Sequence, residues 1–211
     1  MRLCDNINQV PRVVDKTKGQ AVVDIWGATG PLADLVRGAA GASPFLDTVL
    51  TRHADWLTRA VTADAPIFQL IQDLQASENG ARDLRIAKQR VAGFLALAEL
   101  ARSHDILDGT ARLTRFADAA VAKAFELEIG ALQRATKLPE DTRWFVLAMG
   151  KMGAGELNFS SDIDIIVFLD DADVPIDQAF EMRTQMVKAT RRAHKMLTDL
   201  TQDGFVFRTD L

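Results

Sequence analysis

A chain of 211 residues, of which 48% are hydrophobic and 26% are charged, is long enough to bury a sizeable core and has the composition of a soluble globular protein. Its net charge of −4 gives no support to bulk electrostatic binding of nucleic acid, and no apolar run reaches membrane-spanning length. The single cysteine, Cys4, rules out an internal disulfide, and the polar N-terminus has no signal-peptide core, so we expect a cytoplasmic protein with neither a nucleic acid nor a membrane as partner.

Residues 1–42 contain five glycines, which interrupt any long periodicity and predict short helices and loops. Among them, Gly27-Ala28-Thr29-Gly30 is spaced like part of a phosphate loop. The Gly-Lys-Ser/Thr that completes such a loop does not follow, so we interpret this segment as a plain turn.

Helical periodicity begins at residue 43. Ser43 suits an N-cap, Pro44 suits the first helical position, and an apolar face then continues to Leu57. No cluster of metal-ligand type lies near His53 or His104 in the sequence, so we interpret both as structural histidines.

Two longer helices are predicted next. One should run from Gly80 to Leu107. The other should follow Asp108-Gly109-Thr110 and end at Lys137-Leu138-Pro139, because proline disfavours helix in the residue before it. Together with the first helix they predict an antiparallel helical array over about residues 43–137, in which nothing resembles a reaction centre.

The pattern changes from helical to strand-like at Pro139. The elements predicted after it are a strand (144–149), a loop with a short helix (150–161), a strand (163–169), a helix (176–201) that ends at Gly204, and a strand that begins at Phe205.

Two charged clusters in this part of the chain are expected to be solvated. The acids after the second strand lack the spacing of a calcium loop and predict a turn; they are Asp170, Asp171 and Asp173. The long helix carries a basic patch that we expect to face solvent, with contact to a nucleotide phosphate as the alternative; its residues are Arg191, Arg192, His194 and Lys195.

Asp162 and Asp164 open the second predicted strand and project to one face of it, because side chains alternate along a strand. Two neighbouring carboxylates repel each other unless a cation lies between them, and carboxylate oxygens suit Mg²⁺, which also takes phosphate oxygens as ligands. The glycine turn just upstream, from Gly150 to Gly155, can offer backbone N–H groups to such phosphates. The pattern indicates a metal-dependent phosphoryl or nucleotidyl transfer site, and a third acid, Asp210, lies on the third predicted strand.

Two acids on one strand, a third on a later strand and a glycine turn ahead of the pair resemble the nucleotidyltransferases of the DNA polymerase β superfamily. Residues 149–153 (Met-Gly-Lys-Met-Gly) and 156–164 (Glu-Leu-Asn-Phe-Ser-Ser-Asp-Ile-Asp) resemble more closely the glutamine synthetase adenylyltransferase family of adenylyl-transferring and adenylyl-removing enzymes. Ser43-Pro44-Phe45-Leu46 and Leu84-Arg85-Ile86-Ala87 are also similar to the N-terminal helical region of that family, so the resemblance covers about residues 40–211.

The resemblance implies an α+β protein, with an N-terminal antiparallel helical region over residues 1–138 and an incomplete polymerase β-type nucleotidyltransferase core, a mixed sheet with helices, over residues 139–211. It implies that Mg²⁺, with Mn²⁺ as the alternative, is bound by the three catalytic acids Asp162, Asp164 and Asp210. It also implies that ATP or ADP is bound through its phosphates by Gly150, Lys151, Gly153, Ser160 and Ser161.

The placement of the motif after a helical region resembles the first of the two nucleotidyltransferase copies in full-length members. That copy is associated with adenylyl removal, in which inorganic phosphate attacks the adenylyl-tyrosine of glutamine synthetase and releases ADP. Members of the family regulate nitrogen assimilation under the control of PII signalling proteins. The resemblance therefore implies glutamine synthetase as protein substrate and a PII protein as regulator.

Two alternatives remain open. PII uridylyltransferase has a similar glycine loop and Ser-Asp-Ile-Asp, although Asn158-Phe159-Ser160-Ser161 and the preceding helices favour the adenylyltransferase type. The other alternative is a catalytically inactive interaction fragment, because the chain stops one residue after Asp210 and chain ends are poorly tethered. We therefore expect a truncated form or N-terminal fragment of a longer enzyme.

Overall fold

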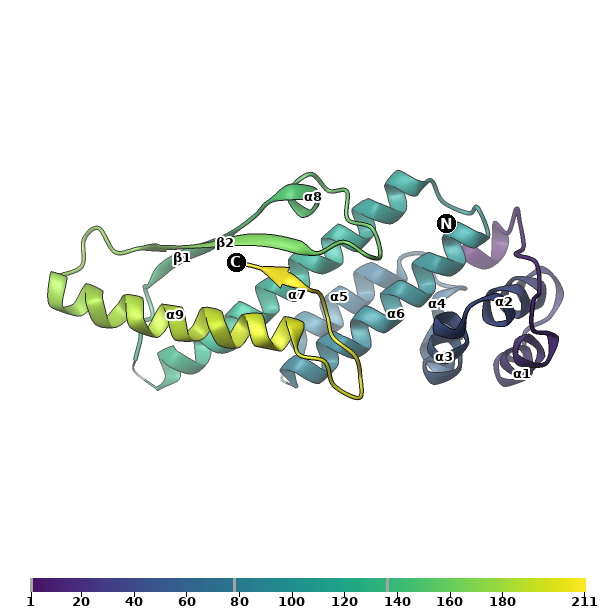
Figure 1. The fold of residues 1–211 in the computed structure, drawn as a ribbon, viewed down its shortest axis with the longest axis horizontal. Helices are drawn as coiled ribbons and strands as arrows, with labels where there is room; N and C mark the ends of the chain where they lie inside the picture. The colour runs from purple at the N-terminus through teal and green to yellow at the C-terminus, as the bar shows by residue number, and fades with distance from the viewer. Residues whose placement is uncertain (1, 78, 136) are drawn as a thin grey trace. The chain divides into compact units, whose positions relative to one another are not determined.

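The computed structural model describes residues 2–77, 79–135 and 137–211, and it confirms the α+β class, with many helices and a small mixed sheet (Figure 1). The helices are η1 (Leu3–Asp5, a 3₁₀ helix), α1 (Lys16–Trp26), α2 (Gly30–Ala42), α3 (Pro44–Arg52), α4 (Ala54–Ala60), α5 (Pro66–Ala76), α6 (Gly80–Leu100), α7 (Ile106–Arg134), α8 (Gly150–Gly153) and α9 (Ile176–Thr198). The strands are β1 (Arg143–Ala148), β2 (Ile163–Asp170) and β3 (Thr209–Asp210).

The chain divides into two compact units. The first contains Met1–Gln72 and Ala87–Leu113, and the second contains Asp73–Ile86 and Thr114–Leu211. Both long helices, α6 and α7, contribute residues to each unit. Among the helices of the residues described above, none is long and apolar enough to cross a membrane.

In the first unit, the segment predicted as short helices and loops forms the two helices α1 and α2. They pack so closely that a Cβ atom at Gly19 would lie 2.4 Å from the carbonyl oxygen of Arg37. Helix α1 ends at Gly27, whose φ of 60° is the left-handed conformation that favours glycine. The indole of Trp26 donates a hydrogen bond of 2.9 Å to the carbonyl oxygen of Leu50, which links α1 to α3.

The helix predicted to begin at residue 43 is interrupted at His53, where α3 ends and α4 begins. Its start agrees with the prediction, because the Ser43 hydroxyl accepts a hydrogen bond of 3.3 Å from the N–H of Leu46 and Pro44 lies in the first turn. His53 leaves the helical conformation, with φ −112° and ψ 23°, and its buried ring hydrogen-bonds to Gln89 at 2.7 Å. This contact explains the break and supports the interpretation of His53 as a structural histidine.

The boundary between α6 and α7 lies earlier than the sequence pattern predicts. The chain turns at Arg102, which has φ 48°, and His104 hydrogen-bonds within this turn to the hydroxyl of the preceding serine at 2.8 Å. The carboxylate of Asp105 accepts a hydrogen bond of 3.1 Å from the N–H of Leu107 at the start of α7. Asp105 therefore caps α7, which begins before the predicted Asp108-Gly109-Thr110.

The sheet of the second unit has the order β1-β2-β3 and is mixed, as predicted. Strand β1 pairs antiparallel with β2 along its whole length. Strand β3 pairs parallel with β2 through two residue pairs, Ile163 with Thr209 and Asp164 with Asp210.

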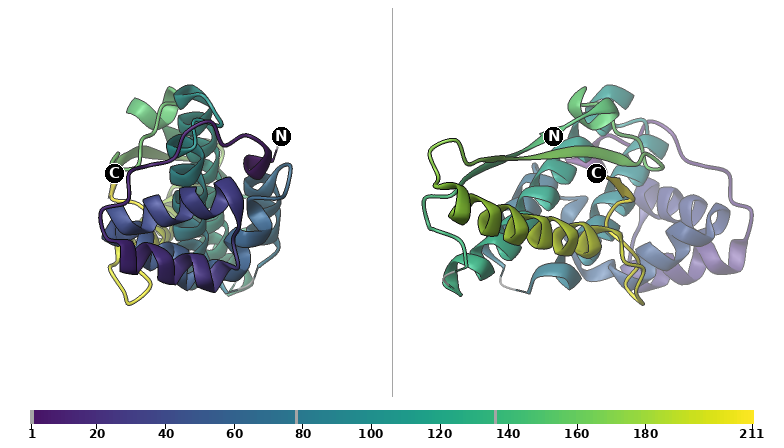
Figure 2. Two further views of the ribbon diagram at one scale, coloured as in Figure 1. Left: turned by 90° about the vertical axis from the view of Figure 1, so that its right-hand side faces the viewer. Right: turned by 60° about the vertical axis from the view of Figure 1, so that its left-hand side comes forward.

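The two faces of this sheet differ in what covers them. On one face, Trp144 stacks on Phe125 of α7 with ring centroids 6.1 Å apart, and α9 lies alongside β2 and β3 (Figures 1 and 2). The opposite face carries large apolar side chains that are 40–56% exposed, namely Phe145, Leu147, Ile166 and Phe168.

Helix α9 ends three residues before the predicted position, and the third strand is shorter than predicted. The N–H groups of Val206 and Phe207 both donate to the carbonyl oxygen of Leu197, at 2.9 and 3.1 Å, so this segment closes against the end of α9 instead of pairing with β2. Gly204, predicted to end the helix, lies in the following turn with φ 78°. Only Thr209–Asp210 pairs as a strand.

Candidate active site

The glycine turn begins where β1 ends. The N–H of Met149 donates a hydrogen bond of 2.8 Å to the carbonyl oxygen of Asp164, which holds the turn against the start of β2. Gly150 follows with φ 53° and opens the four-residue helix α8. Gly153 closes that helix, and a Cβ there would lie 2.6 Å from the carbonyl oxygen of Ala148. Both glycines are thus required by the backbone geometry of the turn.

Asp164 lies directly against this turn. A Cβ atom on Gly150 would lie 2.7 Å from Oδ2 of Asp164. Asp164 is also paired in register with Asp210 on the neighbouring strand, and residues paired in register project to the same face of a sheet. Asp162 precedes Asp164 by two residues, and all three carboxylates are exposed. The structure therefore brings Asp164 next to both Gly150 and Asp210.

Arg208 contacts the remaining acid and was not among the residues predicted from the sequence. Its Nε forms an ion pair with Oδ1 of Asp162, and its Nη2 donates a hydrogen bond of 2.8 Å to the carbonyl oxygen of Ser160. The carbonyl oxygen of Arg208 accepts a hydrogen bond of 2.9 Å from the N–H of Ile163, which fixes its backbone beside β2. The only sequence signal for this role is its position two residues before Asp210.

The segment between the glycine turn and β2 is held by its own polar groups. Asn158 accepts a hydrogen bond of 3.0 Å from the N–H of Ser160 and donates its own N–H to the hydroxyl of Ser161 at 3.2 Å. At its start, the buried N–H of Leu157 donates to the hydroxyl of Thr114 on α7 at 3.2 Å. Ser160 and Ser161 therefore have structural contacts in this segment, and Ser160 is exposed.

The two remaining residues predicted to bind phosphate, Lys151 and Gly153, differ in whether the relevant group already has a partner in the protein. Lys151 is exposed on α8. The N–H of Gly153 already donates a hydrogen bond of 2.9 Å to the carbonyl oxygen of Met149. Of these two, Lys151 is the one with an exposed charged side chain, and it directly follows Gly150 in the turn that contacts Asp164.

The three acids fit a hard divalent cation in kind, because Mg²⁺ and Mn²⁺ prefer oxygen ligands and usually take some of them from substrate phosphates and water. Because Gly150 has no Cβ atom, the Asp164 carboxylate can lie directly against the glycine turn. Within residues 2–77, 79–135 and 137–211, however, no group of three or more His, Cys, Asp or Glu side chains is placed to hold a metal ion. Asp162 is directed to Arg208, so the acids share a face without converging on one point.

The predicted basic patch of α9 consists largely of side chains with structural partners. Arg192 forms an ion pair with Glu128 of α7, and Lys195 lies 3.8 Å from Asp199. The ring of His194 hydrogen-bonds to the carbonyl oxygen of Thr209 at 2.8 Å, which holds β3 at the end of the helix. Arg191 differs from them, because it lines an apolar groove of about 470 Å³ between β2 and α9.

The acidic turn after β2 is exposed and paired with arginines. Arg143 lies 3.2 Å from Asp170 and 3.0 Å from Asp173. Arg183 of α9 forms an ion pair with Asp171 and holds the pKa of that carboxyl below its ordinary value. These contacts agree with the prediction of a solvated turn.

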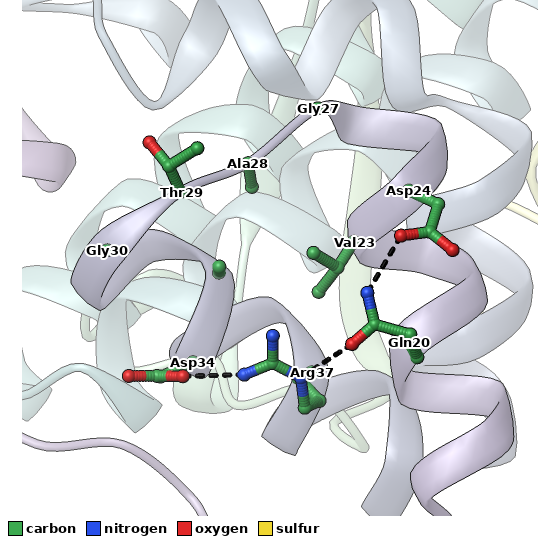
Figure 3. A pocket seen from close by; sticks show the side chains of 10 residues that line it. Gln20, Val23, Asp24, Gly27, Ala28, Thr29, Gly30, Asp34 and Arg37 are labelled. Carbon is green, nitrogen blue, oxygen red and sulfur yellow. Dashed lines mark hydrogen bonds and ion pairs between the residues drawn. The ribbon is translucent and has the colours of Figure 1, made fainter.

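The turn that resembles part of a phosphate loop lines an open hollow of about 680 Å³ in the first unit (Figure 3). Gly30 has φ 59° there, as a turn requires. The Arg37 guanidinium, the cation of this hollow, is engaged by Asp34 at 2.5 Å and by the side chain of Gln20 at 3.1 Å, and Gln20 also donates to Asp24 at 2.7 Å. The lining is more acidic than basic, which supports a plain turn over a phosphate site.

Comparison with known proteins gives a consistent result. Residues 32–211 match the model of the family described as glutamate-ammonia ligase adenylyltransferase. The chain is similar to proteins named bifunctional glutamine synthetase adenylyltransferase/adenylyl-removing enzyme. That of Brucella suis is 36% identical over an alignment of length 198, which covers 85% of this chain and 20% of the relative.

Two further relatives have the same name. The protein of Agrobacterium fabrum is 32% identical over an alignment of length 212, which covers 90% of this chain and 22% of the relative. The protein of Rhizobium meliloti is 33% identical over an alignment of length 221, which covers 93% of this chain and 22% of the relative. The chain thus spans about a fifth of the length of the curated relatives it matches.

Proposed function

The chain belongs to the glutamate-ammonia ligase adenylyltransferase family, and we propose that its second unit is the nucleotidyltransferase core, which transfers an adenylyl group at the edge where β2 and β3 meet. The observation that supports this most directly is the in-register pair of Asp164 and Asp210 beside the glycine turn. Carboxylate oxygens that share a face are the ligands that a divalent cation prefers, and such a cation also takes phosphate oxygens as ligands.

We assign the site residues the following roles. Asp162, Asp164 and Asp210 would hold Mg²⁺ or Mn²⁺, which when bound neutralises negative charge on the phosphate oxygens. Asp210 would also help to activate the attacking oxygen. Lys151 would bind a phosphate oxygen of ATP or ADP through its exposed ammonium. Gly150, through its backbone N–H, and Ser160 and Ser161, through their hydroxyl groups, are proposed to complete the phosphate contacts. Gly153, whose N–H bonds to the carbonyl oxygen of Met149, is proposed to shape the turn that makes them.

We propose the adenylyl-removing direction for this site, because helices precede the glycine turn in the chain, as they precede the first catalytic copy of the family. In that reaction an oxygen of inorganic phosphate forms a bond to the phosphorus of the adenylyl group. The bond from that phosphorus to the tyrosine oxygen of glutamine synthetase breaks, the tyrosine regains a proton, and ADP leaves. The names of the relatives include both adenylyl transfer and adenylyl removal. These names also support glutamine synthetase as the protein substrate.

Regulation and location follow from the same proposal. A PII signalling protein would adjust the reaction to nitrogen status. The proposed compartment is the cytoplasm, where disulfides are rare, and this agrees with the free thiol of the chain's single cysteine.

The first test measures binding of ADP and ATP by calorimetry in the presence of Mg²⁺. Asp162→Asn combined with Asp164→Asn is expected to abolish binding, because both variants keep the side-chain volume and remove the charge. The matched control combines Asp170→Asn with Asp173→Asn, two exposed acids at the far end of β2 that pair with Arg143. Nucleotide binding that survives the first double variant, or no binding by the unaltered chain, would contradict the proposed site.

The second test separates the proposed reaction from its alternatives. The chain is incubated with adenylylated glutamine synthetase and inorganic phosphate, and release of ADP is measured. Release of ADP supports the adenylyl-removing reaction. Uridylylation of a PII protein from UTP without ADP release would favour a uridylyltransferase, and failure of both reactions would favour a non-catalytic interaction module.

A further inference from the structure

Arg208 is a cationic side chain in direct contact with one of the candidate acids, Asp162. It forms an ion pair with Asp162 and a hydrogen bond of 2.8 Å with the carbonyl oxygen of Ser160. We propose that Arg208 competes with the divalent cation for Asp162, so that it holds this carboxylate while no cation is bound and releases it when a cation binds. This inference rests on the proposed function, because it requires that Asp162 be a cation ligand.

The backbone geometry makes Arg208 a fixed competitor. Its carbonyl oxygen accepts from the N–H of Ile163, and the next residue, Thr209, pairs with Ile163 in the sheet. The ring of His194 holds the carbonyl oxygen of Thr209 from the other side. The base of the Arg208 side chain is therefore anchored next to the start of β2, and only its flexible end needs to move when Asp162 is released.

The ion pair engages a carboxylate oxygen that could also coordinate a cation. The Nε–H of Arg208 donates a hydrogen bond to Oδ1 of Asp162. A divalent cation on that oxygen and a guanidinium beside it would repel each other at close range. The two side chains are 63% and 47% exposed, so their ion pair is weak enough to be broken by a bound cation.

Arg208 has a second possible role, which predicts the opposite result. If its bonds to Asp162 and Ser160 serve only to hold the segment before β2 in place, its removal would loosen that segment and weaken cation binding. Competition instead predicts that removal of Arg208 strengthens cation binding. An exposed ion pair of this kind corresponds to a change of about two- to fivefold in affinity.

The experiment titrates Mn²⁺ alone into the chain and measures its affinity by calorimetry and by the paramagnetic signal of free Mn²⁺. Arg208→Met and Arg208→Gln are expected to bind Mn²⁺ about two- to fivefold more tightly than the unaltered chain. Arg143→Met is the matched control, since Arg143 is equally exposed and pairs with acids at the other end of the same strand. It removes one positive charge and should leave the Mn²⁺ affinity unchanged.

A direct measurement on the unaltered chain does not depend on the folding of any variant. The Nε–H resonance of Arg208 is followed by NMR during titration with Mg²⁺, and it should shift as Asp162 is released. An unchanged resonance at saturating Mg²⁺, or a Mn²⁺ affinity that is unchanged or weaker in both Arg208 variants, would overturn the competition. A last comparison tests the metal site itself. If the unaltered chain binds no Mn²⁺, or if the double variant Asp162→Asn with Asp164→Asn binds Mn²⁺ equally well, the proposed metal site is wrong and this inference is overturned with it.

Discussion

A Cβ atom on Gly150 would lie 2.7 Å from Oδ2 of Asp164, so the position of this carboxylate depends on the absence of a side chain at the start of the glycine turn. Gly150 also has φ 53°, a conformation that costs other L-residues about 1–2 kcal/mol. Gly150→Ala is therefore expected to destabilise the chain by about 1–2 kcal/mol and to displace Asp164, lowering Mn²⁺ affinity by about tenfold. Urea denaturation and Mn²⁺ titration measure the two effects.

Gly155→Ala is the matched control for this change. Gly155 has φ 78°, but a Cβ there would meet no described atom within 4 Å. It should therefore show a similar loss of stability with unchanged Mn²⁺ affinity. Equal losses of Mn²⁺ affinity in the two variants would mean that backbone strain, and not the contact with Asp164, controls the site.

Gly19 and Gly130 should respond to alanine in opposite directions. Glycine to alanine within a helix usually stabilises it by about 1 kcal/mol. At Gly19 the new Cβ would lie 2.4 Å from the backbone oxygen of Arg37, so α1 and α2 must separate, at a cost of about 1–3 kcal/mol. At Gly130 the nearest atom is Nη1 of Arg134 at 3.3 Å, the flexible end of a side chain.

The expected outcome is a lower free energy of unfolding for Gly19→Ala and a free energy of unfolding raised by about 0.5–1 kcal/mol for Gly130→Ala. Urea denaturation of both variants measures this. If both substitutions stabilise the chain, α1 and α2 can separate enough to accommodate one methyl group at little cost in free energy.

Thr114 accepts the buried N–H of Leu157 and so holds the segment that leads to the candidate acids. Thr114→Val keeps the shape of the side chain but leaves that N–H without this acceptor, which is expected to cost about 1–3 kcal/mol. Nucleotide affinity should fall as well, because residues 158–162 follow directly. The checks are urea denaturation and hydrogen exchange at the amide of Leu157. Thr114→Ser, which keeps the hydroxyl, should lose less stability; a larger loss in the serine variant would assign the effect to packing of the methyl group.

Local patterns were sufficient to predict part of the geometry around the candidate site and part of the fold. The glycine turn and the acids Asp162 and Asp164 lie within 15 residues of one another, and alternation along a strand determines which side chains share a face. Ser43 was identifiable as a helix start because its capping bond joins residues three apart. In these places the geometry depends on neighbours in the chain.

Contacts between distant residues account for what the sequence did not predict. Arg208 meets Asp162 across 46 positions, and His53, which breaks the predicted helix, meets Gln89 across 36. The third strand was predicted too long because its first residues bond to Leu197 at the end of α9, a partner that alternation of apolar and polar residues does not reveal.

Because of Lys88, the free energy of unfolding of the first unit is expected to change with pH in the alkaline range. Burial lowers the pKa of its ammonium from 10.5 to about 8. The unfolded chain keeps this proton up to about pH 10.5 while the folded chain releases it above about pH 8, so the unfolded state binds more protons in this window and stability rises with pH through it. Below pH 8 the full cost of burying the charge is present. Lys88→Met removes that cost and should stabilise the chain at pH 7 by about 3 kcal/mol.

The measurement is urea denaturation at several pH values from 7 to 10.5. The chain has no tyrosine and one cysteine, and the contributions of all other groups are common to Lys88→Met and the unaltered chain, so they cancel in the difference between the two. The gain from Lys88→Met should shrink as pH rises from 8 to 10.5, because the unaltered chain then recovers the same stability. Lys18→Met, at an exposed lysine of α1, should give no such pH-dependent difference. A difference between Lys88→Met and the unaltered chain that stays constant across the window would show that Lys88 is protonated in the folded state throughout it.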